Sequence, residues 1–163
     1  MLASLLVLVS CNEVDDSTLP SFAVNVDLSN QGIWNTYGVH GYGDFQYFIL
    51  AEGIREPAGF PYNSFSATGY GGILLICGQG FSGDVEPLAY DLSCPVERLP
   101  YVRVYIDETT LDAVCPDCGS HYNVVEGNGG PRSGPAVTLQ VALTPYACYP
   151  TNLGGYYITR RDP

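Results

Sequence analysis

The chain consists mostly of short apolar segments that are separated by turn residues. Apolar and polar residues alternate over 22–29 (FAVNVDLS) and partly over 45–52 (FQYFILAE), which is the pattern of a strand with one buried face. Residues 71–78 (GGILLICG) are continuously apolar between glycines, which predicts a strand buried on both faces. Further segments, each ended by proline, glycine or a polar turn, are 86–93, 101–108, 112–115, 121–125, 137–146 and 156–161.

These segments predict an all-β protein. They recur at roughly 8–12-residue spacing and are enriched in β-branched and aromatic residues, which favours an antiparallel sandwich or barrel. No stretch of about 12 residues carries the apolar stripe of a helix, and at most a single helical turn is expected near Trp34. The longest loop is expected over 55–72.

Length and charge narrow the classes of function. With 163 residues the chain has the size of one ordinary domain. It carries 17 acidic and 6 basic residues, all of the latter arginine, for a net charge of −11. Nucleic-acid binding depends on basic residues that neutralise phosphate, so this balance argues against a nucleic-acid partner. It argues equally against docking on an anionic membrane through a basic patch.

The N-terminal segment MLASLLVLVSC is apolar but too short to cross a bilayer as a helix. It has the character of the hydrophobic region of a secretory signal. Residues 8–11 (LVSC) resemble a bacterial lipobox, in which the cysteine is lipidated and becomes the mature N-terminus. The alternative is a buried apolar segment followed by an incidental cysteine. Because the segment lacks lysine and arginine, a true start upstream of Met1 would supply the missing basic residues.

The N-terminal pattern predicts where the protein resides. We expect a lipoprotein signal peptide over 1–10, lipidation of Cys11 and an acidic tether over 11–21. The protein is then exported and lipid-anchored in the bacterial cell envelope, at the outer membrane or the cell surface. Its contact with the membrane is made through the N-terminal lipid.

Export would place the other five cysteines in a compartment that permits disulfides. They are Cys77, Cys94, Cys115, Cys118 and Cys148. Because their number is odd, pairing alone cannot use them all. Cys77 lies in the apolar run ILLIC, where a buried inert thiol is expected, and a Cys77–Cys148 disulfide requires that their strands are neighbours.

Cys115 and Cys118 form a CxxC motif in a loop of Pro, Asp and Gly. A thioredoxin-like function requires this motif at the N-terminus of a helix, which lowers the pKa of the first thiol. A strand and a glycine turn follow here, so that function is disfavoured. The segment CPDCG suits a zinc knuckle locally, but a zinc ribbon needs a second pair, and upstream there is only Cys94.

Two segments around these cysteines belong together, LSCPVE (92–97) and CPDCGSHYNVVEGNGGPRSGPAVTLQV (115–141). They resemble the ligand boxes of the Rieske iron–sulfur domain family. That family has a C-x-H box, a C-x-x-H-G-S box with an aromatic residue two after the serine, a glycine turn, and a Gly-Pro-Ala loop leading into a Leu-bearing strand. The matching positions are Cys94 with Val96, Cys115 with Cys118, Gly119-Ser120, Tyr122, Gly127, Gly134-Pro135-Ala136 and Leu139.

The resemblance covers roughly 22–161 and is densest over 88–139. It implies a Rieske-like β domain over 22–163, an antiparallel sandwich or barrel. Within that domain it implies a small subdomain of the cluster-binding type over about 88–136.

The ligand positions depart from the family pattern. A Rieske cluster is bound by two cysteines on one iron and two histidines on the other. Here Val96, which has no donor atom, stands at the first histidine position, and Cys118, which is a thiolate ligand, at the second. Three thiolates are then in place. The candidates for a fourth ligand are Glu97 and His121, although His121 alternates away from Tyr122 along its strand.

Three outcomes follow for Cys94, Cys115 and Cys118. They hold a complete redox-active two-iron two-sulfur cluster, or one zinc ion with Glu97, His121 or water as the fourth ligand, or no metal. In the third outcome a Cys94–Cys115 or Cys94–Cys118 disulfide ties the two loops together, or the thiols stay free. We expect the third outcome and therefore no cofactor.

The function expected from these observations is non-enzymatic. The chain has no G-x-S-x-G, no H-E-x-x-H and no phosphate-binding glycine loop. We expect a lipid-anchored envelope protein with a degenerate Rieske-like domain, at most a component of electron transfer. The alternatives are an electron carrier with an unusual Cys-rich cluster, and a lipoprotein that binds zinc or has a purely structural or interaction role. The sequence identifies no protein or redox partner.

Overall fold

The structure is a computed structural model that describes residues 19–80, 82–126 and 128–161. The expected signal peptide, Cys11 and most of the acidic tether lie outside these residues, as does Gly127. Within the described residues no helix is long and apolar enough to cross a membrane.

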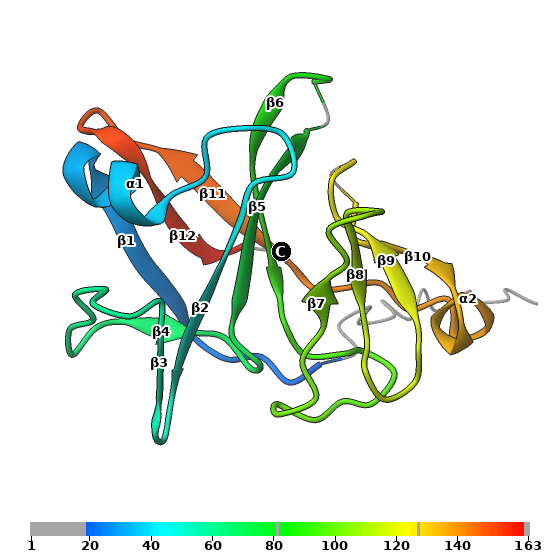
Figure 1. Cartoon of the computed structure of the whole chain (residues 1–163). Helices are drawn as coiled ribbons and strands as arrows, with labels where there is room; N and C mark the ends of the chain where they lie inside the picture. Colours follow the sequence, from blue (N-terminus) through cyan, green and yellow to red (C-terminus); the bar gives the residue numbers. More distant parts are fainter. Residues whose placement is uncertain (1–18, 81, 127, 162–163) are drawn as a thin grey trace, which may run out of the picture.

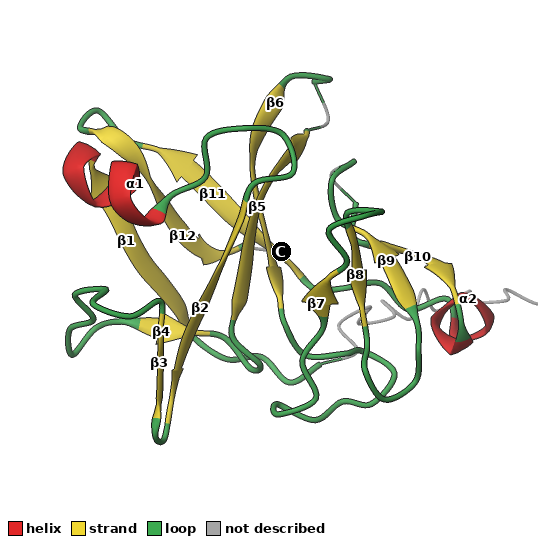
Figure 2. Ribbon diagram, viewed as in Figure 1, coloured by secondary structure: helices red, strands yellow, loops and turns green. Residues whose placement is uncertain are grey.

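The larger of two sheets is antiparallel and has eight strands (Figures 1 and 2). The strands, in spatial order, are β3 (Ile54–Glu56), β2 (Phe45–Ala51), β5 (Ile73–Gln79), β6 (Val85–Asp91), β11 (Pro145–Pro150), β12 (Gly154–Arg160), β1 (Val24–Asn30) and β4 (Ala67–Thr68). The sheet curls until its two edge regions meet. Strands β2 and β4 come together there, and the backbone N–H of Leu50 donates to Thr68 Oγ1 at 3.1 Å.

A second, four-stranded sheet is inserted between β6 and β11 in the sequence and lies beside β5 and β6 (Figure 1). Its strands, in spatial order, are β10 (Gly130–Ser133), β9 (His121–Asn123), β8 (Asp112–Val114) and β7 (Tyr105–Ile106). The short helix α2 (Pro135–Leu139) follows β10. This small sheet lies within the subdomain expected over about 88–136, whereas the first residues of that range belong to β6 of the large sheet.

Two hydrophobic cores hold the sheets, and β5 belongs to both. Ile73, Leu75 and Cys77 face the core inside the curled sheet, together with side chains of β1, β12 and helix α1 (Gln31–Tyr37). Leu74 and Ile76 face the other core, between the outer side of the curled sheet and the small sheet. The predicted burial of this strand on both faces is therefore confirmed.

The all-β prediction is confirmed, and most predicted strands coincide with observed ones. Helix α1 is longer than the single turn expected near Trp34, since Asn30 caps it by accepting from the backbone N–H groups of Gly32 and Ile33. The short strands β3, β4 and β10 were not predicted; β4 and all but the first residue of β3 lie in the loop expected over 55–72.

The strand predicted over 137–146 is wrong. Residues Pro135–Leu139 form α2 instead, and β11 begins only at Pro145. Pro135 occupies the start of the helix, where its fixed φ suits a helix and its missing N–H costs nothing. The alternation of apolar residues does not reflect burial either, because Val137 and Leu139 are both exposed.

A buried carboxylate joins the parts of the fold next to the small sheet. Asp91, at the end of β6, accepts hydrogen bonds from the backbone N–H groups of Tyr70, Gly71 and Ser93 and from the hydroxyl of Tyr146 on β11. Burial raises the pKa of Asp91 above its usual value, while these hydrogen bonds act in the opposite direction. Asp91 thereby fixes the chain three residues before Cys94.

Candidate metal centre

The structure brings Cys94, Cys115 and Cys118 together. Among the described residues their sulfur atoms all lie within 4.8 Å of one another, and the Sγ atoms of Cys94 and Cys118 are 3.7 Å apart. Cys94 and Cys115 are buried, and Cys118 is half-buried. Cys94 follows β6, and the other two occupy the loop between β8 and β9, so the group joins the two sheets.

The loop that carries Cys115 and Cys118 is a tight turn. The backbone N–H of Gly119 donates to the carbonyl of Cys115 at 3.0 Å, and the N–H of Cys115 donates to the carbonyl of Ser120 at 2.9 Å. Gly119 has φ of +66°, in the left-handed region that favours glycine. The glycine of CPDCG therefore lets the chain return directly, which places both sulfur atoms on the same side of the turn.

Two hydroxyl groups contact the sulfur atoms. Tyr122 places its hydroxyl 3.4 Å from Cys94 Sγ, and Ser120 places its Oγ 3.2 Å from Cys118 Sγ. Ser120 Oγ also accepts the backbone N–H of Ala136 at 3.1 Å. With Cys118 as a thiol, its S–H donates to Ser120 Oγ. When Cys118 ionises, the serine O–H can turn to donate to the sulfur, which is the arrangement that stabilises a thiolate.

The pKa values of the two CxxC thiols diverge. Burial raises the pKa of Cys115 to about 12, against backbone N–H groups of the loop that lower it. Burial also raises the pKa of Cys118, but hydrogen bonds act more strongly in the opposite direction. Those with Ser120, together with contributions from Cys115 and Cys94, leave the pKa of Cys118 below its usual value. Cys118 is thus the thiol that ionises most readily of this pair.

The separation of Cys94 Sγ and Cys118 Sγ suits two ligands of a single tetrahedral ion, and the third sulfur lies within 4.8 Å of both. Zinc binds thiolate sulfur at about 2.3 Å, so the edge of a regular tetrahedron between two such sulfurs is about 3.8 Å. The Cys94–Cys118 separation of 3.7 Å equals that edge within a tenth of an ångström or so. The buried triad could therefore hold a metal ion.

The expected fourth ligands are not in this group. His121 lies on the opposite face of β9 from the buried Tyr122, and its Nδ1 is 3.4 Å from Asp112 Oδ2. Glu97 is half-buried in the loop after Cys94, with its carboxylate outside the 4.8 Å group. Val96 packs as an apolar side chain against the core between the curled sheet and the small sheet.

The structure contains none of the disulfides considered from the sequence, since the five described cysteines are free. The Cys94–Cys118 sulfur separation of 3.7 Å is far beyond an S–S bond of about 2.05 Å, and Cys115 is likewise unbonded. Strand β6 lies between the strands of Cys77 and Cys148, so their Cα atoms are roughly 9.5 Å apart or more, whereas a disulfide needs about 7 Å or less.

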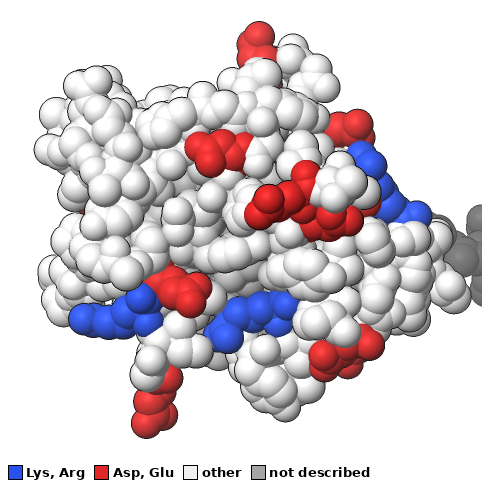
Figure 3. All heavy atoms as spheres, in the orientation of Figure 1, with Lys and Arg blue, Asp and Glu red and all other residues white. Residues whose placement is uncertain are grey.

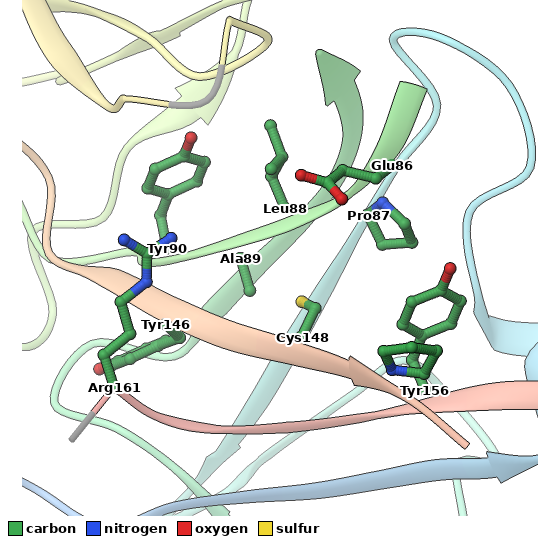
Figure 4. A pocket seen from close by; sticks show the side chains of 10 residues that line it. Glu86, Pro87, Leu88, Ala89, Tyr90, Tyr146, Cys148, Tyr156 and Arg161 are labelled. Carbon is green, nitrogen blue, oxygen red and sulfur yellow. The ribbon is translucent and has the colours of Figure 1, made fainter. Parts of the chain in front are cut away.

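A cavity of about 150 Å³ lies elsewhere, where β6 and β11 diverge. The sequence carries no signal for this cavity, because it arises where the β6–β11 ladder stops after Tyr146. Figure 4 shows Arg161 and the thiol of Cys148 at this cavity, with the Tyr90 hydroxyl turned away from the guanidinium. These polar groups do not converge on one point. The metal centre is therefore the stronger candidate site.

Charge on the visible face is dispersed. Figure 3 shows acidic side chains scattered over this face, with the arginines in separate small groups beside them. Among the ion pairs of the described residues, Arg132 lies 3.4 Å from carboxylate oxygens of both Asp112 and Glu126.

The chain matches no protein-family model, and comparisons with curated proteins and with solved structures found no match.

Proposed function

We propose that the protein is a non-enzymatic β protein whose small sheet carries a structural zinc site, with Cys94, Cys115 and Cys118 as thiolate ligands to one ion. The observation that supports this most directly is the separation of 3.7 Å between Cys94 and Cys118 Sγ, with the third sulfur within 4.8 Å of both. The hydroxyls of Ser120 and Tyr122 are outer partners that orient and stabilise the thiolates.

A two-iron two-sulfur cluster fits these residues less well. It needs four protein ligands, and Val96 offers no donor atom. The Rieske resemblance would put Cys94 and Cys115 on one iron and Cys118 on the other. Cys94 and Cys118 instead have their sulfurs 3.7 Å apart, and all three sulfurs lie within 4.8 Å of one another. A single ion bound by all three thiolates accounts for this arrangement, because it does not need a second ligand pair that includes Val96.

The role of the ion is to connect the two sheets. Cys94 continues from β6 of the large sheet, whereas Cys115 and Cys118 belong to the β8–β9 loop of the small sheet. Binding to the folded state alone would stabilise that packing through mass action. The Rieske-like character of the subdomain, and export with a lipid anchor at Cys11, remain proposals that rest on sequence motifs.

The test is the metal content of the full chain, purified without chelators and without added metal. We expect close to one zinc per chain by elemental analysis, and one Co²⁺ bound with thiolate-to-cobalt charge-transfer absorption after exchange. Iron and acid-labile sulfide in equal amounts, two of each per chain, would support the electron carrier instead. A reduced chain that takes up neither zinc nor cobalt would overturn both metal functions.

Ser120 is expected to support the metal ligands. Ser120→Ala removes the O–H that faces Cys118 and leaves the buried Ala136 N–H without an acceptor. We expect zinc affinity to fall by about 10-fold and the free energy of unfolding of the metal-free chain to fall by about 1–3 kcal/mol. Competition with a chromophoric chelator and denaturant titration measure the two effects. Exposed Ser133→Ala is the control, and equal zinc affinity in both variants would contradict the role given to Ser120.

A further inference from the structure

The two cysteine loops have the same local sequence pattern and the same turn. From this equivalence we infer that Glu97 is the fourth ligand of the metal centre. The inference rests on the proposed zinc site and identifies the group that completes it.

The equivalence begins with the sequence. Each loop starts with Cys-Pro, as Cys94-Pro95 and as Cys115-Pro116. In each loop the first cysteine is anchored to the returning chain by its backbone N–H, which donates to the carbonyl of Val102 at 3.0 Å in the first loop and of Ser120 at 2.9 Å in the second. Both loops therefore leave a strand-like segment at a cysteine and turn at a proline.

The backbones then close in the same way. The N–H of the fifth residue donates to the carbonyl of the first cysteine, from Arg98 to Cys94 at 2.8 Å and from Gly119 to Cys115 at 3.0 Å. The fifth residue has positive φ in both loops, +56° at Arg98 and +66° at Gly119. This conformation is ordinary for glycine but uncommon for arginine, so the first loop has the turn without the residue that favours it.

Aligning the loops residue by residue places Glu97 at the position of Cys118, because each is the fourth residue of its loop. Val96 then corresponds to Asp117, the third residue. This alignment differs by one residue from the Rieske resemblance, which pairs Val96 with the first histidine. The contacts agree with the loop alignment, since Val96 packs against apolar side chains.

Glu97 has the chemistry and the freedom to bind the ion. Carboxylate oxygen is a zinc ligand, at about 2.0–2.2 Å. Within the described residues Glu97 makes no hydrogen bond and no ion pair at or below 4.0 Å, so no such contact holds its side chain elsewhere. Its carboxylate lies outside the sulfur group, so binding the ion requires rotation about the Glu97 side-chain bonds. Three thiolates and one carboxylate carry the same total charge as the four thiolates of common structural zinc sites.

His121, the other candidate, is held away from the centre. Its Nδ1 faces Asp112 Oδ2 at 3.4 Å, and Asp112 is also contacted by Arg132 Nε at 3.4 Å. Its strand neighbour Tyr122 is the residue that points to Cys94. For His121 to bind the ion, the side chain would have to cross to the other face of β9.

The test compares Co²⁺ and Zn²⁺ binding by the full chain and by Glu97→Gln, Glu97→Cys and His121→Gln, with the exposed Glu52→Gln as the matched carboxylate control. Glu97→Gln is expected to weaken zinc binding by at least about 10-fold. Glu97→Cys is expected to keep one ion and to raise the thiolate-to-cobalt absorbance by about one third, as four thiolates replace three. His121→Gln and Glu52→Gln are expected to match the unsubstituted chain.

The outcomes separate the two proposals. If the unsubstituted chain binds cobalt with three-thiolate absorbance, but Glu97→Gln binds as tightly and Glu97→Cys adds no absorbance, Glu97 is not the ligand and the metal centre still stands. A loss of affinity confined to His121→Gln would assign the fourth position to His121 and overturn the inference. If the unsubstituted chain binds no metal, the centre and the inference fail together. Thermal unfolding of each metal-free variant shows whether it is folded before binding is compared.

Discussion

Replacing Cys115 with serine is expected to abolish stoichiometric metal binding by the full chain. Cys115 is buried and supplies one of the three sulfurs that converge within 4.8 Å. Serine lacks the soft thiolate that zinc prefers, and two thiolates with the one carboxylate inferred for Glu97 make a much weaker site than three thiolates and a carboxylate. Zinc content is expected to fall from about one per chain to about a tenth or less, by elemental analysis after dialysis.

The same variant is expected to lose the stabilisation that zinc confers. At a free zinc concentration about 100-fold above Kd, linkage gives about 2.7 kcal/mol to a chain that binds only when folded. The unsubstituted chain should therefore unfold at a higher temperature with zinc than without, and Cys115→Ser should show no such difference. Comparison of each variant with and without zinc removes any general cost of the substitution.

Cys148→Ser is the matched control. Burial raises the pKa of Cys148 to about 12, as it does for Cys115. Cys148, however, lies on β11 at the cavity where β6 and β11 diverge, and not among the three converging cysteines. It should retain one zinc and the full thermal response. Retention of zinc by Cys115→Ser, or its loss from Cys148→Ser, would contradict the assignment of the ligands.

The second large effect is expected at Asp91. Asp91→Ala leaves the N–H groups of Tyr70, Gly71 and Ser93 and the hydroxyl of Tyr146 without their acceptor. Since a buried polar group without a partner is costly, we expect a loss of about 3–5 kcal/mol in the free energy of unfolding. For a chain of this length that corresponds to a fall in Tm of about 10 °C.

Denaturant titration at neutral pH measures the effect of Asp91→Ala. Asp91→Asn, which keeps one acceptor oxygen, should fall between the alanine variant and the unsubstituted chain. Exposed Asp27→Ala, which removes one local hydrogen bond to Ser29, should cost less than about 1 kcal/mol. If Asp91→Ala is no less stable than Asp27→Ala, the hydrogen bonds of Asp91 to Tyr70, Gly71, Ser93 and Tyr146 do not hold the fold together as described.

Most strands of the fold could be predicted from the sequence, because their apolar residues either alternate regularly with polar ones or form short continuous runs. The run in β5 is the clearest case, since its continuous apolar character corresponds to two cores. The segment after Gly134 could not be predicted in this way. Its alternating apolar residues suggest a strand, but the hydrogen bond from Ala136 N–H to Ser120 and the proline at the helix start determine α2.

The cysteine triad could also be anticipated, because the motif analysis grouped Cys94 with the CxxC motif. The choice of Glu97 over His121 as the proposed fourth ligand could not be made from the sequence. The correspondence of Glu97 with Cys118 depends on the positive φ of Arg98, and arginine gives no sequence signal for that conformation. The separation of Cys77 from Cys148 depends likewise on strand order, which places β6 between them.

The most direct test of the metal centre is X-ray absorption spectroscopy at the zinc edge on the full chain as purified. We predict a first coordination shell of three sulfurs at about 2.3 Å and one oxygen at about 2.0–2.2 Å, with no metal neighbour. A shell of nitrogen and oxygen only would show that the three cysteines are not the ligands. Absence of zinc, together with an iron spectrum that contains an iron–iron scattering path, would contradict the single-ion site and establish the two-iron cluster in its place.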